Sequence, residues 1–353
     1  MPRSRKSDAP EIPAANATRR PQMADIARMA GVAPSTVSRA LAGSTLVNEE
    51  TRARIAELAR TLNYSVNVAA QNLRLKQNRT VAVVVPYDPA TRQHLSDPFF
   101  LALIGSIADA LTDCGYEMLL SRVNADHLDF ASQAYDSGRA MGVILIGQWH
   151  HHDQLNDMVM RGIPFVVWGA NLPIQLYCTV GSDNVQGGKA ATTHLLQQGA
   201  RSIAFVGDTE LPEVNRRYEG YVLAHKETGL TPDPALCLPS PFVRDAVQND
   251  VQKLLLQGSK FDGLFAASDL IAMTAIGTLR QYGKDVPRDI MVVGYDDIEL
   301  AGFVQPSLTT VRQPIEAAGV ALVETLLKVS AGERPASVQL VTELIKRQTT
   351  RSV

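Results

Sequence analysis

The side chains best suited to chemistry near the N-terminus are three hydroxyls and one guanidinium within five positions. Ser35, Thr36, Ser38 and Arg39 lie in the stretch DIARMAGVAPSTVSRAL, which spans Asp25–Leu41. Serine and threonine can bond to phosphates or base edges, and arginine can bind O6 and N7 of guanine with two hydrogen bonds. On a helix these groups suit the major groove of DNA. A three-helix bundle with a polar face is the alternative.

Two short helices must position these groups. Gly31 is expected to end the first helix in the left-handed conformation that glycine adopts readily. Pro34 suits the first position of the second helix because its fixed φ and missing N–H cost little there. A third helix is expected to begin after Asn48, a good N-cap, and to complete one small core. The residues expected to face that core are Ala24, Ile26, Ala27, Ala30, Val32, Val37, Ala40, Leu41, Ile55, Leu58 and Leu62.

Charge is distributed unevenly along the 353 residues. Residues 1–79 hold 13 Lys and Arg against 6 Asp and Glu, whereas the remainder holds 21 against 30. A basic head on an acidic body indicates that only the head meets nucleic acid, and chance clustering with a solvated tail is the alternative. Residues 1–22 are expected to be a disordered basic tail, with the folded part beginning near Met23.

Several classes of protein are disfavoured. The sequence has no run of 18 apolar residues, so no transmembrane helix is expected. The N-terminus lacks the apolar region of a secretory signal. Cys114, Cys178 and Cys237 are odd in number and widely spaced, which suits a reducing cytoplasm and gives no disulfide or zinc framework. The histidine run at 150–152 is expected to lie in a solvated loop. No phosphate loop, dinucleotide fingerprint or nucleophile elbow is found, so we expect no enzyme, no cofactor and no metal site.

From Thr80 the pattern changes to short apolar runs that alternate with amphipathic helices. Such runs are typical of parallel strands covered on both faces, and their number predicts two doubly wound halves. Ligands bind such sheets at the carboxyl ends of the strands. The expected strands are 80–86, 117–123, 142–147, 164–169, 202–208, 263–268 and 290–297, and the expected helices are Phe99–Cys114, Asn184–Gln198, Arg217–Thr228, Ala246–Leu256 and Leu270–Tyr282.

The N-terminal stretch resembles a known family. DIARMAGVAPSTVSRAL, followed by VNEETRARIAELARTLNYSVNVAAQNL, is similar to the headpiece of the lactose-repressor family of bacterial transcription regulators. SDNVQGGKAATTHLLQQGARSIAFVGD and VPRDIMVVGYDDIELAGFVQPSLTTVRQP resemble the effector domain of the same family. That domain shares the fold of periplasmic sugar-binding proteins. The resemblance spans about Met23 to Val353.

The resemblance implies roles for residues of the head. It places Pro34, Ser35 and Arg39 at base-reading positions and Thr36, Ser38 and Tyr64 at phosphate-contacting positions. Ala33 replaces the usual N-cap serine, which is expected to weaken the start of the second helix by about 1 kcal/mol. Pro34 has no donor and can offer only apolar contact, for example to a thymine methyl.

The segment after the head resembles the hinge helix of the family, which orders on DNA and pairs with its mate in the dimer. Asn67, Ala70 and Leu73 are the expected DNA-binding residues of this hinge. Leu73 matches the leucine that wedges into the minor groove and kinks the duplex, and an ordinary linker residue is the alternative. Val66 departs from the family, because proline is common there.

The resemblance also implies an effector site at the strand ends of the body. Asp296, in GYDD, matches a carboxylate that can accept two sugar hydroxyls, although it could instead cap a helix. Arg217 matches the effector arginine of the family. Trp168 stands where the family often has an Asp-Arg pair, and it could stack on a sugar or belong to the core. The expected effector-binding residues are Phe99, Phe100, Trp168, Arg216, Arg217, Ser268, Asp296 and Gln313.

The expected fold is multidomain: an all-α helix-turn-helix headpiece plus an α/β periplasmic-binding-protein-like effector domain of two doubly wound subdomains. The expected segments are a tail (1–22), the headpiece (23–66), a hinge helix and linker (67–79) and an effector-binding and dimerisation domain (80–353). The two subdomains are expected to comprise about 80–180 with 311–335, and 181–310 with 336–353.

The resemblance implies a ligand-responsive DNA-binding transcription regulator, a repressor of sugar-utilisation genes. A homodimer is expected to bind a near-palindromic operator in double-stranded DNA. The expected location is the cytoplasm, in association with the nucleoid, and no membrane partner is expected. A sugar or sugar derivative is expected to rotate the halves and change hinge pairing. A nucleobase effector or an activating role are alternatives within the family. A solute-binding transport protein would need a signal peptide and no head.

Overall fold

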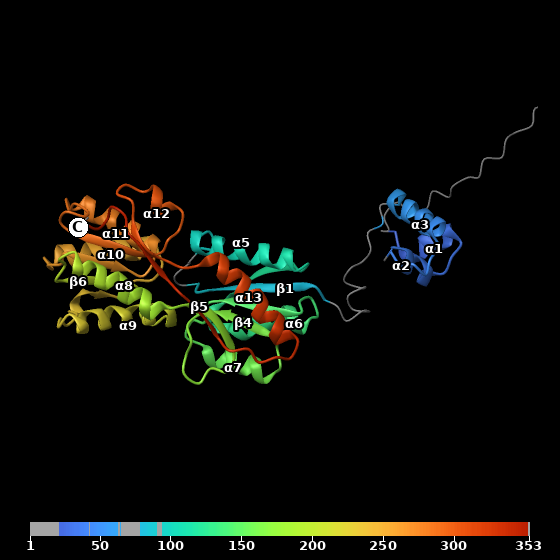
Figure 1. Ribbon diagram of the computed structural model, residues 1–353, viewed down its shortest axis with the longest axis horizontal. Coiled ribbons are helices and arrows are strands. Elements are labelled where there is room, and N and C mark those ends of the chain that lie inside the picture. Colours follow the sequence, from blue (N-terminus) through green and yellow to red (C-terminus); the bar gives the residue numbers. More distant parts are fainter. Residues whose placement is uncertain (1–20, 42, 63, 65–77, 90–93, 352–353) are drawn as a thin grey trace, which may run out of the picture. The chain divides into compact units, whose positions relative to one another are not determined.

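The chain divides into two compact units, Met1–Gln77 and Asn78–Val353, which we call the head and the body. A computed structural model describes residues 21–41, 43–62, 64, 78–89 and 94–351 (Figure 1). The expected tail, except for its last two residues, and the expected hinge residues Asn67, Ala70 and Leu73 lie outside the described residues.

Three helices build the head, namely α1 (Met23–Ala30), α2 (Pro34–Leu41) and α3 (Glu49–Thr61). Local backbone chemistry sets their ends, as predicted. Gly31 has a φ of 62° and donates its N–H to carbonyls of the last turn of α1. Pro34 is the first residue of α2. The Asn48 Oδ1 atom accepts a hydrogen bond from the Thr51 N–H at 2.8 Å and caps α3.

One small core holds these helices together. Ile26, Val37 and Ile55, one from each helix, are fully buried at its centre. The Arg54 guanidinium on α3 donates a hydrogen bond to the Ala30 carbonyl at 2.9 Å, which satisfies a group at the end of α1. Helices this short are unstable alone, so the shared core and this capping bond fix their relative positions.

Two six-stranded sheets form the body, in the orders β11-β5-β4-β3-β1-β2 and β12-β10-β9-β8-β6-β7. Strands β10 and β12 pair antiparallel, and the other described pairs are parallel. The strands are β1 (Thr80–Tyr87), β2 (Glu117–Asn124), β3 (Gly142–Ile146), β4 (Phe165–Trp168), β5 (Cys178–Ser182), β6 (Ile203–Val206), β7 (Cys237–Leu238), β8 (Gly263–Ala266), β9 (Met291–Asp296), β10 (Thr309–Arg312), β11 (Val338–Leu340) and β12 (Glu343–Ile345).

The two sheets are wound alike. In each, the first strand along the chain lies between the second and the third, so the winding direction reverses between β1 and β3 and between β6 and β8. Such a reversal leaves a crevice at the carboxyl ends of the two strands, where ligands of this architecture bind. The body therefore offers two such crevices, one from each sheet.

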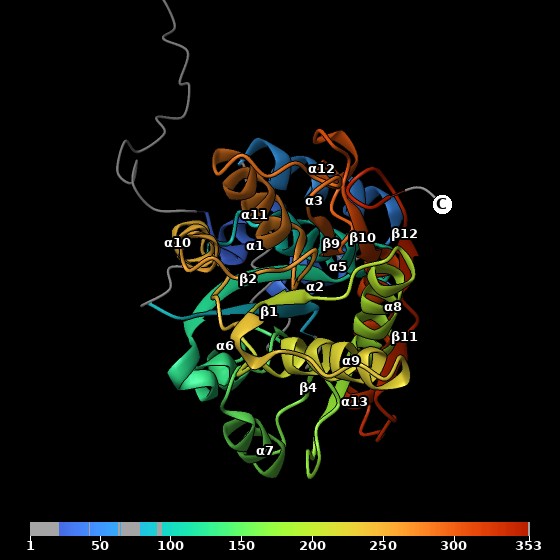
Figure 2. The same cartoon turned by 90° about the vertical axis from the view of Figure 1, so that its left-hand side faces the viewer.

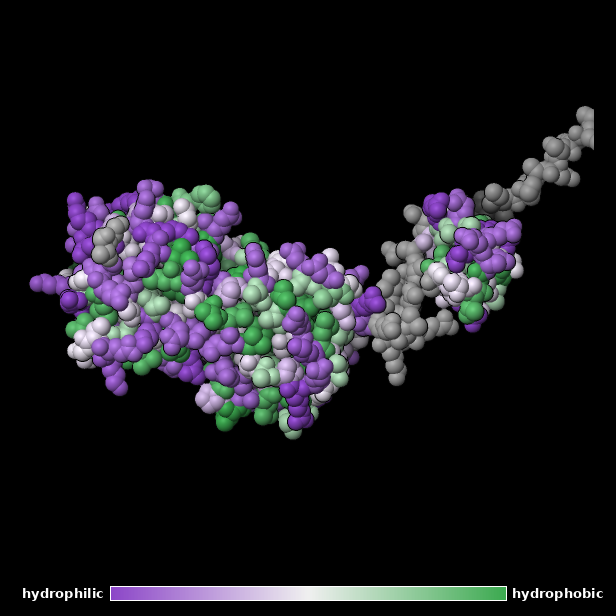
Figure 3. Space-filling model, viewed as in Figure 1, coloured by the Kyte–Doolittle hydropathy of each residue, from purple (hydrophilic) through white to green (hydrophobic). Residues whose placement is uncertain are grey.

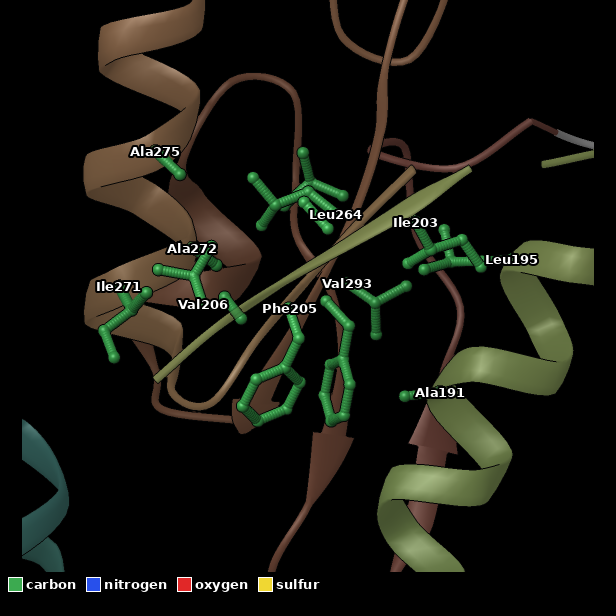
Figure 4. Close-up of a cluster of buried hydrophobic side chains, with 14 of the residues drawn as sticks. Ala191, Leu195, Ile203, Phe205, Val206, Leu264, Ile271, Ala272, Ala275 and Val293 are labelled. Atoms are coloured by element: carbon green, nitrogen blue, oxygen red, sulfur yellow. The ribbon is translucent and has the colours of Figure 1, made fainter. Parts of the chain in front are cut away.

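Helices cover both faces of each sheet (Figures 1 and 2). Figure 4 shows α11 and α8 contributing side chains to one buried cluster from opposite sides of the strands of the second sheet. No described helix is long and apolar enough to cross a membrane. The helical elements of the body are α5 (Pro98–Asp113), η1 (Ala125–Ser132), α6 (Gln133–Asp136), α7 (His152–Met160), α8 (Asn184–Gln197), α9 (Pro212–Glu227), η2 (Pro234–Leu236), α10 (Arg244–Leu256), α11 (Asp269–Gln281), α12 (Leu300–Phe303) and α13 (Ile315–Ser330).

The chain passes between the two sheets three times, from β5 to α8, from β10 to α13 and from β11 to β12. These crossings correct the expected subdomain boundaries at 311 and 336. Strand β10 keeps Val311 and Arg312 in the second sheet. Strand β11 pairs with β5 in the first sheet, where Val338 and Leu340 pack on the core. Three-residue edge strands are too short to show a period in the sequence.

The helix that carries Arg217 begins earlier than expected. It starts at Pro212 rather than at Arg217, because proline is favoured in the first turn and the apolar Val214 is already buried there. Arg217 consequently lies in the second turn of α9, and Glu213 lies in the first.

Candidate functional site

The outer face of α2 carries the groups expected to contact DNA. Val37 and Ala40 are buried in the core of the head and turn this face outward. Pro34, Ser35 and Arg39 are exposed, and Thr36 and Ser38 are half-buried. Small hydroxyls and one guanidinium thus share an accessible surface on a helix, which is the arrangement that base and phosphate contacts require.

In the described part of the head no carboxylate pairs with Arg39, unlike Arg28 and Arg60. Arg28 pairs with Asp25 at 2.7 Å, and Arg60 pairs with Glu57 at 2.7 Å. Within the described part of the head, no ion pair or hydrogen bond engages the Arg39 guanidinium. All its donors therefore remain available for a ligand such as a guanine edge or a phosphate.

Two further residues of the head bear on the expected DNA contacts. Tyr64 is half-buried, packs against the core of the head and donates its backbone N–H to the Ala59 carbonyl at 2.8 Å. Ala33 precedes α2, and its carbonyl accepts from the Thr36 N–H at 2.9 Å. The alanine methyl cannot accept a hydrogen bond, so the side-chain cap that a serine would supply is missing here.

A cavity in the body lies where the winding of both sheets reverses. Its empty volume is about 690 Å³, including the part open to solvent, and the space open to water-sized molecules is about 100 Å³. Six of the eight residues expected to bind the effector line it, namely Phe99, Phe100, Trp168, Arg217, Ser268 and Asp296. The other lining residues are Asp97, Ile146, Gly147, Trp149, Leu211, Glu213, Val214 and Phe242.

Arg217 is almost fully buried and rigidly held. Its Nε donates to the Asn184 Oδ1 atom at 2.8 Å, and its Nη1 donates to the Ala267 carbonyl. The guanidinium lies 3.9 Å from the centre of the Tyr295 ring, a cation–π contact. Because two of its nitrogens are already used, Arg217 can offer a ligand only its remaining donors, in a fixed direction.

Asp296 ends strand β9 in a strained turn. Its φ is 119° and that of Asp297 is 57°, both in the region that favours glycine. The Asp296 Oδ1 atom accepts from the Gln313 amide at 2.7 Å. Burial raises the pKa of Asp296 well above its ordinary value, and nearby Arg217 opposes that increase.

Asp269 anchors the turn that holds Asp296. This fully buried carboxyl accepts from the Thr310 hydroxyl at 2.5 Å and from the Ile298 N–H at 2.9 Å. Burial raises its pKa to about 7, while the two hydrogen bonds act to lower it. Asp269 follows Ser268, whose hydroxyl accepts from the Ile271 N–H at 3.2 Å and caps α11. Ser268 thus both lines the cavity and begins the helix.

Aromatic rings form much of the wall of the cavity. Phe99 lies with its ring centre 5.8 Å from that of Phe100 and 6.2 Å from that of Trp168. Trp149 has a φ of 50° and follows Gln148, which is fully buried. The Gln148 amide donates to the Ala170 carbonyl at 2.8 Å and accepts from the Ala170 N–H at 2.9 Å. The loops after β3 and β4 are thereby fixed together.

Glu213 was not expected in the site, yet it faces the cavity from the first turn of α9. The side chain is half-buried overall, but its Oε1 atom is shielded from solvent and has no hydrogen-bond partner among the described residues. Burial raises the pKa of Glu213, and interactions with backbone N–H groups of Glu213 and Gln148, together with the charges of Arg217 and His150, partly offset that increase. A buried acceptor without a partner is costly, so it is a strong candidate for ligand contact.

Two of the expected effector residues do not line this cavity. Arg216 points elsewhere and pairs with Glu219 at 2.8 Å. Gln313 is buried behind Asp296 and holds it by a side-chain hydrogen bond. Gln313 is therefore placed to position Asp296 and lies outside the lining of the cavity.

The histidine run divides between a loop and a helix. His151 lies 3.5 Å from Asp126, and His152 begins α7. Among the described residues, no group of three or more potential ligands could hold a metal ion. His150 and His151 belong to the loop that carries Trp149 past the carboxyl end of β3.

Comparison with known proteins assigns both units to families. The description "Bacterial regulatory proteins, lacI family" matches residues 22–67, and a periplasmic binding protein-like domain matches residues 192–350. The HTH-type transcriptional regulator CelR of Thermobifida fusca is 32% identical over 331 residues, which are 92% of this chain and 96% of CelR.

Solved structures match along nearly the whole chain. A complex of the transcriptional regulator CelR with cellobiose is 31% identical to this chain and has a TM-score of 0.68. The match covers 94% of this chain and 100% of the CelR chain. A Lac repressor dimer bound to operator and the anti-inducer ONPF has a TM-score of 0.82 over 95% of this chain and 100% of its own. At 23% identity, this second match concerns the fold alone.

Proposed function

The chain belongs to the lacI family of bacterial regulatory proteins, and we propose that Ser35 and Arg39 read an operator while the body cavity binds the effector that controls this binding. The chain is thus a ligand-responsive DNA-binding transcription regulator. In our proposal, residues of α2 bind the operator and residues of the body cavity bind the effector. The observation that supports it best is the free guanidinium of Arg39 on the exposed face of α2.

Binding to DNA rests on the outer face of α2. Arg39 can bind guanine through two hydrogen bonds, and the Ser35 hydroxyl can bond to a neighbouring base. Thr36, Ser38 and Tyr64 contact phosphates in this proposal, and all three are half-buried, so part of each remains accessible. Asn67, Ala70 and Leu73 of the hinge complete the DNA-binding set, with Leu73 inserted in the minor groove.

The effector of this proposal is a sugar or a sugar derivative. Asp296 and Glu213 can bind hydroxyls, Arg217 supplies a fixed donor, and the rings of Phe99 and Trp168 can stack on the apolar face of a sugar. The relative CelR has been solved with cellobiose, which agrees with this assignment. A nucleobase is the second candidate, because the same aromatic walls would hold a flat ring equally well.

A homodimer in the cytoplasm is part of the proposal. Figure 3 shows hydrophobic side chains gathered over α5 and α13 in the body. Leu101 and Val320 on these helices are 53% and 49% exposed and line a groove between the two halves. An apolar surface of this kind on a soluble protein indicates a partner, and a second copy would place two heads on a two-fold operator.

The first experiment identifies the operator with the full-length chain. Selection from random duplexes followed by fluorescence anisotropy should yield a near-palindrome whose affinity falls steeply with salt. Arg39→Ala should relax preference at one position in each half-site. A selected pool without two-fold symmetry would contradict the dimer, and unchanged base preference in the variant would contradict the role of Arg39.

The second experiment identifies the effector class. A thermal-shift screen of sugars and nucleobases should give a specific stabiliser, worth about 2.7 kcal/mol at a hundredfold excess over Kd. The same compound should change the anisotropy of the operator complex. A stabilising nucleobase, with no response to any sugar, would favour the second candidate.

A further inference from the structure

The folded part of the head carries almost no net charge. Residues 21–64 hold five arginines and no lysine, against four acidic residues, so their formal net charge is +1. Contacts between basic side chains and phosphates supply a large share of the affinity of DNA-binding proteins, because they release the cations that surround the duplex. The three helices of the head alone therefore provide little of this electrostatic affinity.

Partners within the head already occupy most of these arginines. Arg28, Arg52 and Arg60 each pair with a carboxylate three residues earlier on the same helix, at 2.7, 3.7 and 2.7 Å. The Arg54 guanidinium donates to a carbonyl at the end of α1. In the described part of the head, this leaves Arg39 as the arginine without a protein partner. A paired arginine that approached a phosphate would bring the negative charge of its carboxylate with it, so the three pairs add little attraction for DNA.

Basic charge is concentrated instead in the segments on either side of the three helices. Residues 1–20 hold five basic residues against two acidic ones, a formal net charge of +3, and residues 65–79 hold three basic residues and no acidic one. The second segment contains the expected hinge. The first, which we call the arm, precedes residue 22, where the match to the lacI family begins. The basic residues of the arm, which lie outside the described residues, are Arg3, Arg5, Lys6, Arg19 and Arg20.

The start of α1 joins the arm to the part of the head that meets the DNA backbone. When the second helix of a helix-turn-helix unit lies in the major groove, the first helix crosses the phosphate backbone. Arg20 precedes Met23, the first residue of α1, by three positions, and Arg19 precedes it by four. At about 3.5 Å per residue, the Cα atoms of both arginines lie within about 14 Å of that helix end. Their side chains can therefore reach the phosphates that α1 crosses.

The carboxylate closest in sequence to these two arginines already has partners. The Asp25 Oδ2 atom accepts from the Gln22 N–H at 2.9 Å, and its Oδ1 atom accepts from the Arg28 guanidinium at 2.7 Å. Gln22 is exposed, so the chain enters α1 from an accessible surface. The start of α1 therefore offers little competition with a phosphate for Arg19 and Arg20.

The second basic group of the arm can reach phosphates outside the half-site. Lys6 precedes Met23 by 17 positions, and Arg3 precedes it by 20. A chain of 20 residues spans at most about 70 Å, which is about two turns of duplex DNA. The length of the arm therefore allows contacts well beyond the groove that α2 occupies.

We propose that residues 1–20 are a DNA-binding arm, in which Arg19 and Arg20 bind phosphates beside α1 and the group at positions 3–6 binds phosphates farther along the duplex. The arm supplies affinity and its dependence on salt, whereas α2 supplies sequence preference. Its partner is the phosphate backbone of double-stranded DNA, so its contacts do not depend on base sequence. The inference rests on the proposed function, since it takes α2 as the helix in the major groove.

The test is fluorescence anisotropy of the full-length chain with its selected operator and with a random duplex, over about 50 to 200 mM salt. Each phosphate contact contributes about 0.9 to the slope of log affinity against log salt concentration. Arg19→Gln combined with Arg20→Gln removes four contacts from a dimer, so the slope on the operator should become shallower by about 3.6. The slope on the random duplex should become shallower as well. Base preference at every operator position should stay unchanged.

Two further variants control for charge alone. Arg28→Gln combined with Arg60→Gln removes the same charge from two arginines that already pair with carboxylates. Exposed pairs of this kind contribute little to stability, so this matched control should fold, and its slope should change by less than about 1. Asp8→Asn combined with Glu11→Gln removes both acidic groups of the arm and should tighten binding to both duplexes.

The possible outcomes separate the arm from the proposed function. Equal slopes for wild type and the Arg19 and Arg20 variant overturn the arm, and so does an equal loss of slope in the matched control. Tighter operator binding by the Arg19 and Arg20 variant also overturns it, because the arm would then bind the acidic body in place of DNA. If the slope falls as expected but Arg39→Ala leaves base preference unchanged, the role of Arg39 is wrong and the arm is not. If wild type selects no operator, the slopes on the random duplex still decide the inference.

Discussion

Replacing Asp269 by asparagine should remove a large pH dependence from the stability of the body. The Asp269 carboxyl is fully buried, and its pKa is raised from 3.8 to about 7 because burial disfavours the charged form. Asparagine keeps an oxygen to accept from the Ile298 N–H, and its amide can donate to the Thr310 hydroxyl. The variant therefore resembles the protonated acid in shape and charge.

The sign of the effect follows from proton uptake. Between the two pKa values, the folded state keeps the proton of Asp269 and the unfolded state has lost it, so stability falls as pH rises. This contribution is fully present below pH 4 and lost by about pH 7. At about 1.4 kcal/mol per pKa unit, the loss is about 4 kcal/mol over that range. Asp269→Asn should gain about 3 kcal/mol relative to wild type between pH 4.5 and 6.5.

Urea unfolding followed by tryptophan fluorescence measures this difference. The sequence has two tryptophans, and both line the cavity of the body, so the signal reports the body and not the head. Asp245→Asn, at an exposed position in the first turn of α10, is the matched control and should follow wild type at every pH. Parallel stability curves for wild type and Asp269→Asn would refute the reasoning, because they would mean that Asp269 keeps an ordinary pKa in the folded state.

Three further substitutions test the operator and effector sites. Arg39→Ala should cost about 1–3 kcal/mol of operator affinity and relax selectivity at one base position, measured by anisotropy with single-base operator variants. Asp296→Ala should abolish the effect of the ligand on operator binding and leave binding itself unchanged; a normal response curve would remove Asp296 from the site. Leu73→Ala should reduce the bend of the bound duplex, measured by energy transfer between its ends. A bend equal to that of wild type would exclude the wedge.

Local backbone chemistry made the head predictable. Gly31, Pro34 and Asn48 each fix a helix end through an effect confined to a few residues, and the structure has all three as expected. The short apolar runs of the sheets were also predictable, because each strand is buried over consecutive residues. Helix α13 was not among the expected helices, although its buried residues Ala318, Leu322 and Leu326 recur every four positions.

The effector cavity was predictable only in part. Arg217 and Asp296 lie in motifs that identify them, whereas Trp149 and Phe242 come from loops without a period and meet only after the sheets have formed. Glu213 had one available indication, since Pro212 favours the first turn of a helix and would place an acid beside the cavity. Because the helix was expected to begin at Arg217, Glu213 was not considered as a helical residue beside the cavity.

The buried Gln148 amide has a consequence for how specificity could evolve. It joins the loops after β3 and β4 through main-chain atoms of Ala170 and the Tyr177 hydroxyl, at 2.8 to 3.0 Å. The paths of both loops therefore depend little on which side chains stand at 149 and 150. Substitutions at these two positions can change ligand preference while the two loops keep their paths, so the body provides a frame on which new effector responses can be selected without loss of folding.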